Sequence, residues 1–83
     1  VSTGYFILAD STGQIIYHPN KELLNTNIKD AATISDNLKE ALANHKHGRI
    51  VFTESNIKTH GYVSEVGGIG WTVVSALPDK EFN

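Results

Sequence analysis

The stretch from Gly4 to Asn20, GYFILADSTGQIIYHPN, decides the fold. Residues 3–9 are aromatic and branched, and they are too few and too evenly apolar for an amphipathic helix. They predict a central strand buried on both faces. Asp10 can close a type I turn through its side chain, and Gly13 stands where a positive φ would be needed. The stretch therefore predicts a tight hairpin.

The second arm of this hairpin is predicted at residues 14–18. Pro19 ends it, because proline has no N–H to give to a strand ladder and keeps the preceding residue extended. Residues 21–32 are mostly polar and predict an ordered loop with room for one short helical turn. Three apolar residues are expected to anchor this loop, namely Leu23, Leu24 and Ile28.

One helix is clearly predicted between Thr33 and Gly48. Apolar residues recur there with helical spacing, which is typical of a helix with one buried face. Thr33 with Asp36 three residues later is a weak capping box, and Gly48 marks the end. The predicted stripe consists of Ile34, Leu38, Ala41, Leu42 and His45.

Three further strands are predicted at residues 49–54, 58–66 and 70–77, separated by short turns. The glycine-rich segment 67–70 is read as a hairpin turn and not as a phosphate loop, because strands flank it on both sides. A single helix must bury its stripe against one face of the sheet. We therefore expect an α+β fold in which a five-stranded antiparallel sheet has its last strand beside the first and one main helix on one face.

Length and composition limit what the chain can do. Its 83 residues suit a single domain, 1–83, and the net charge of -2 without a basic patch makes nucleic acid an unexpected partner. The absence of cysteine excludes disulfides and thiolate metal sites. No apolar run is long enough to span a membrane.

Neither catalysis nor a bound metal or cofactor is predicted. No familiar nucleophile and base arrangement is present. His45 and His47 form the densest pair of possible metal ligands, but two residues apart on a helix they would point in different directions. They are expected to be structural or exposed.

The candidate ligand contacts are polar aromatic residues on the predicted strands. Tyrosine hydroxyls that face a half-open pocket can bind a small carboxylate or amine without a full charge. His18 can instead fix the loop by a hydrogen bond, and Trp71 is expected to seal the core. The predicted contacts are Tyr5, Tyr17, His18 and Tyr62.

The motifs of this sequence resemble those of Cache domains, which are extended PAS-like sensor domains. The resemblance lies in the segment 4–10, Gly13 and the segment 15–20, and again near the end, in the segment 70–74 followed by Leu77, Pro78 and Glu81. The residues that carry the family's fold signature are Gly4, Asp10, Gly13, His18, Pro19, Gly70 and Trp71.

This resemblance implies a PAS-like sheet and a non-enzymatic role as the extracytoplasmic sensor of a bacterial chemotaxis receptor or sensor kinase. It is most like the membrane-proximal subdomain of a double-Cache module, so the chain is expected to be a piece of a larger membrane receptor. The implied partners are a small organic ligand such as an amino acid or carboxylate, an adjoining subdomain, transmembrane helices and a second copy of the receptor. The alternative is a cytoplasmic PAS-like or profilin-like protein-interaction domain.

Overall fold

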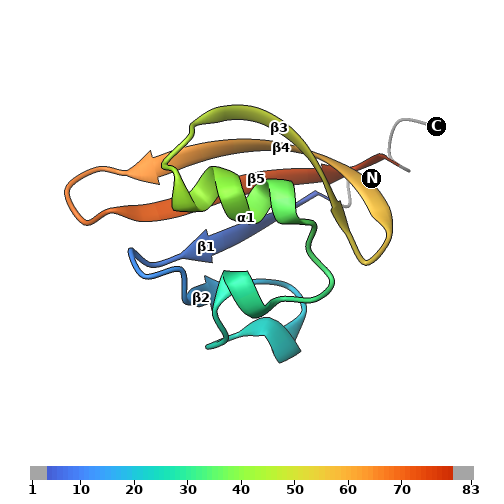
Figure 1. Cartoon of the computed structure of the whole chain (residues 1–83), viewed down its shortest axis with the longest axis horizontal. Helices are drawn as coiled ribbons and strands as arrows, with labels where there is room; N and C mark the ends of the chain where they lie inside the picture. The colour runs from blue at the N-terminus through green and yellow to red at the C-terminus, as the bar shows by residue number, and fades with distance from the viewer. Residues whose placement is uncertain (1–3, 80–83) are drawn as a thin grey trace.

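The computed structural model describes residues 4–79 and has a five-stranded antiparallel sheet crossed by one helix (Figure 1). The strand order is β2-β1-β5-β4-β3, so the last strand lies beside the first, as predicted. The predicted α+β, PAS-like architecture is confirmed. The strands are β1 (Tyr5–Ala9), β2 (Ile15–Tyr17), β3 (Gly48–Glu54), β4 (Ile57–Val66) and β5 (Trp71–Pro78).

The hairpin between β1 and β2 closes as its sequence predicts. The Asp10 carboxylate accepts hydrogen bonds from the backbone N–H of Thr12 at 2.9 Å and of Gln14 at 3.0 Å. The Thr12 hydroxyl, more than these N–H groups, holds the pKa of Asp10 below its ordinary value. Gly13 has a φ of 91°, which residues with a side chain rarely adopt.

The prediction that the first strand is buried on both faces is wrong. Ile7 and Ala9 are buried under the helix, whereas Phe6 on the opposite face is 57% exposed. The reason is that the only α-helix in the described part of the chain covers one face of the sheet, so β1 alternates like any half-buried strand.

The loop after β2 holds two short 3₁₀ turns where one was expected. They are η1 (Lys21–Leu23) and η2 (Ile28–Asp30). The side chains of Asn20 and Asn27 cap them by accepting hydrogen bonds from the backbone N–H of Glu22 and Lys29. The predicted anchors hold, because Ile28 is buried and Leu23 and Leu24 pack against the core.

The helix α1 (Asp36–Ala43) is shorter than its apolar stripe predicts. It begins after Ser35 and not after Thr33, so the predicted cap is wrong. The Ser35 hydroxyl accepts a hydrogen bond from the backbone N–H of Thr53 on β3, and this contact between elements fixes where the helix can start. His45 has a φ of 54° and lies beyond the helix, so the stripe ends earlier than predicted.

The core lies between the sheet and α1. Trp71 is not part of it, contrary to the core-sealing role expected of it, because it pairs with Val66 on the opposite face of the sheet from the buried Val74. No helix within residues 4–79 is long and apolar enough to cross a membrane. The largest fully buried apolar side chains are Phe52, Ile7, Ile15, Leu38, Val63 and Val74.

Candidate functional site

A pocket of about 500 Å³ opens at the end of the sheet where β1 begins and β5 ends. We call it the Glu54 pocket. It brings together the first described residue, the end of β2 with the following loop, the β3–β4 turn and the last residue of β5. Its lining consists of Gly4, Tyr5, His18, Pro19, Asn20, Glu54, Ser55, Ile57, Thr59 and Pro78.

Glu54 is the centre of a buried polar cluster in this pocket. It is only 8% exposed, which is unusual for a carboxylate. The Tyr5 hydroxyl donates a hydrogen bond to Oε1 of Glu54, and Nε2 of His18 lies against Oε2. The rings of Tyr5 and His18 also contact each other, with centroids 5.6 Å apart and planes tilted by 53°. The start of β1, the residue after β2 and the end of β3 are thus tied together at one point.

The hydrogen bonds of His18 define which ring nitrogen carries the proton. The backbone N–H of Asn20 donates to Nδ1 of His18 at 2.9 Å, so Nδ1 must present a lone pair. The ring proton therefore sits on Nε2, which faces Oε2 of Glu54. His18 is thus neutral in this arrangement.

Tyr5 is neutral as well. Burial raises the pKa of its phenol above the ordinary value, and the hydrogen bond and negative charge of Glu54 raise it further. Both oxygens of Glu54 face donors, so the side chain acts as an acceptor and hence as a carboxylate.

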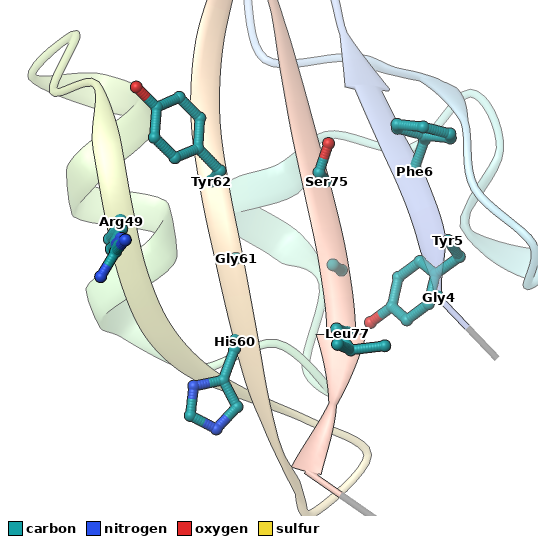
Figure 2. Close-up of a pocket in the computed structure, with 10 residues that line it drawn as sticks. Gly4, Tyr5, Phe6, Arg49, His60, Gly61, Tyr62, Ser75 and Leu77 are labelled. Atoms are coloured by element: carbon teal, nitrogen blue, oxygen red, sulfur yellow. The ribbon is translucent and has the colours of Figure 1, made fainter. Parts of the chain in front are cut away.

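A second hollow, of about 700 Å³, lies on the sheet face that α1 does not cover, which we call the open face (Figure 2). Tyr62 stands up from β4, Arg49 from β3 and Phe6 from β1, with Ser75 between Tyr62 and Phe6. Tyr62 is 55% exposed. This hollow is apolar and open, and suits a flat contact better than an enclosed small molecule.

The structure brings together only two of the four predicted ligand contacts. Tyr5 and His18 share the Glu54 pocket. Tyr62 lies on the open face, and Tyr17, which is 52% exposed, pairs with Leu8 at the outer edge of the sheet. Sequence reasoning missed Glu54, although its spacing from Phe52 places it on the core-facing side of a predicted strand, where an acid is unexpected.

The fold-signature residues occupy turns and strand ends. Gly4 and Pro19 line the Glu54 pocket, and Gly70, with a φ of 74°, precedes Trp71 at the start of β5. These are positions where the backbone changes direction.

The histidine pair after α1 is arranged differently from the prediction. Because the helix has ended, His45 and His47 both lie 3.9 Å from the Glu65 carboxylate instead of pointing apart. Across residues 4–79, however, no group of three or more such side chains is placed to hold a metal ion.

Two solved structures resemble this chain over nearly its whole length. The extracellular domain of the histidine kinase soHK1S-Z6 matches with a TM-score of 0.73 and 24% identity, over 92% of this chain and 29% of that one. The ligand-binding domain of the amino acid chemoreceptor PctB of Pseudomonas aeruginosa PAO1, solved in complex with L-Arg, matches with a TM-score of 0.63 and 16% identity, over 95% and 32%.

The chain thus spans about a third of each of these solved chains. No model of a protein family and no curated protein matches the sequence. The strand order, the single covering helix and both structural matches agree on the architecture. The chain therefore shares the fold of these two solved domains.

Proposed function

We propose that this chain is the extracytoplasmic sensory domain of a bacterial transmembrane signalling receptor of the chemoreceptor or histidine kinase type. The observation that carries the proposal is the match of 92% of the chain to the extracellular domain of a histidine kinase with a TM-score of 0.73. The match to the ligand-binding domain of a chemoreceptor supports the same role. The role is sensory and not enzymatic.

The position of the Glu54 pocket supports a mechanism for this role. Gly4, before β1, and Pro78, at the end of β5, both line the pocket, and β1 is paired with β5 along its whole length. A change in the pocket therefore acts on β1 and β5 at the end of the sheet where β1 begins and β5 ends. The domain senses a small organic ligand, or relays its binding elsewhere in the receptor, through these strands.

Of the four predicted ligand contacts, Tyr5 and His18 are kept in this proposal, and Tyr17 and Tyr62 are assigned to the exposed surface. Tyr5 and His18 meet a ligand in the Glu54 pocket. Tyr62 and Tyr17 are reached from outside, where the apolar open face offers a surface to an adjoining subdomain, to a helix leading to the membrane or to a second copy. Exposed apolar side chains in a group are typical of such contacts.

A reversible cross-link tests the relay through β1 and β5. Phe6 and Ser75 are register partners on the open face, and cross-strand partners lie within the range that a disulfide spans. We expect the double variant Phe6→Cys with Ser75→Cys, in the full receptor, to change signalling output on oxidation and to recover on reduction. The chain contains no cysteine of its own to interfere.

The matched control joins β3 to β4 through the register partners Thr53 and Lys58, near the hairpin turn. Its oxidation is expected to leave signalling output unchanged, because β3 and β4 are neither the first nor the last strand of the sheet in the sequence. Signalling output that does not change when the double variant Phe6→Cys with Ser75→Cys is oxidised would contradict the proposed relay.

A further inference from the structure

We infer that the Glu54 pocket binds a small organic cation, a primary ammonium group carried on a short apolar body. This inference rests on the proposed sensory function and deepens it, because it commits the pocket to one class of ligand.

The buried cluster of Glu54, His18 and Tyr5 carries a net charge. Glu54 is a carboxylate, His18 is held neutral by the backbone N–H of Asn20, and the raised pKa of Tyr5 keeps its phenol neutral. The three side chains together therefore carry one negative charge. Among the described residues, neither lysine nor arginine lines the pocket, so this charge has no cationic partner there.

Burying that negative charge costs free energy. A buried carboxylate without a positive partner is unfavourable, and hydrogen bonds from neutral donors offset only part of the loss of hydration. Tyr5 and His18, which contact Glu54 here, are both neutral donors. A ligand cation that reached Glu54 would supply the missing charge.

The size and lining of the pocket also favour such a ligand. Its volume of about 500 Å³ lies in the range of small-molecule sites. Pro19, Ile57 and Pro78 give it apolar walls, while Tyr5 and His18 contact Glu54. This distribution suits a molecule with one charged end and one apolar end, and a carboxylate ligand would be repelled by Glu54.

Calorimetric titration of the 83-residue chain at neutral pH, with three probes of equal length, tests the inference. We expect butylamine to bind about tenfold or more tightly than butanol, because hydrogen bonds to a charged partner are the stronger ones, and butyrate not to bind. Equal binding of butylamine and butanol, or preferred binding of butyrate, would overturn the inference.

Two variants with opposite expected effects separate a lost contact from a lost fold. Glu54→Gln keeps the shape and removes the charge, so butylamine should bind about tenfold more weakly. Tyr5→Phe removes a donor that partly compensates the carboxylate, so butylamine should bind at least as tightly as to the unmodified chain. Glu65→Gln, at an exposed carboxylate beside His45 and His47, is the control and should change nothing.

Unchanged butylamine binding in Glu54→Gln, or its loss in Tyr5→Phe, contradicts the inference. Such a result leaves the sensory role itself standing, because the cross-link between β1 and β5 and the location of the domain are measured without any ligand of this pocket.

Discussion

His18 joins two parts of the chain through the two nitrogens of its ring. Nδ1 accepts the Asn20 N–H at 2.9 Å and so holds the loop after β2, while Nε2 faces Glu54 on β3. The residue is 4% exposed, so both of these contacts are buried. His18 therefore fixes the loop, as its sequence position suggested, and also lines the candidate pocket.

Replacing His18 by alanine should lower the free energy of unfolding by about 1–3 kcal/mol, because the Asn20 N–H and the Glu54 carboxylate both lose a buried partner. Urea unfolding followed by circular dichroism measures this change. His47→Ala is the control, since half of that side chain is exposed, and it should stay within about 0.5 kcal/mol. Similar values for the two variants would contradict the role of His18.

Tyr5 predicts how stability depends on alkaline pH. Since the pKa of its phenol is raised in the folded chain, the folded state holds this proton more tightly than the unfolded state does. The stabilisation is complete below the ordinary tyrosine pKa of about 10 and is lost as the pH rises above it. Unfolding experiments between pH 9 and 11 should show this loss.

The variant Tyr5→Phe should remove this alkaline dependence, whereas Tyr62→Phe, at an exposed tyrosine on the open face, should keep it. The same slope in Tyr5→Phe as in the unmodified chain would show that the loss arises elsewhere.

At the scale of the elements, the first hairpin depends on Gly13. Its φ is 91°, and a Cβ added there would meet Oδ1 of Asn27 at 3.0 Å. Gly13→Ala should therefore destabilise the fold by about 1–3 kcal/mol. Gly67→Ala is the matched control, because a Cβ there meets no atom within 4 Å and its φ is not positive. Comparable melting temperatures for the two variants would contradict this account.

Elements whose signals are local could be predicted from the sequence. The turn residues Asp10 and Gly13 and the stop at Pro19 placed the first hairpin, and its short strands followed from them. The start of α1 could not be placed, because the Ser35 hydroxyl is engaged by Thr53 across the domain. A capping pattern read along the chain does not contain such a contact.

The candidate site, too, could be predicted from the sequence only in part. Tyr5 and His18 could be proposed from residue type and position. Their meeting with Glu54 could not, because Glu54 lies 49 residues beyond Tyr5 and only the pairing of β1 with β5, of β5 with β4 and of β4 with β3 brings them together. Tyr17 and Tyr62 have the same chemistry, but the sheet turns them outward.

At the scale of the whole molecule, the sheet has one face covered by α1 and one open face with exposed aromatic side chains. A sensory domain within a larger receptor explains this asymmetry, because adjoining segments would cover the open face. A cytoplasmic interaction domain would use such a face too. The two possibilities differ in the compartment in which the domain resides.

The side of the membrane on which the domain lies therefore tests the central claim most directly. Ile69 is 54% exposed in the turn before β5, and Ile69→Cys introduces a thiol into a chain that has none. In intact cells producing the full receptor, a maleimide that cannot cross the inner membrane should label this variant and not its parent. Labelling that appears only after the cells are lysed would contradict an extracytoplasmic sensor.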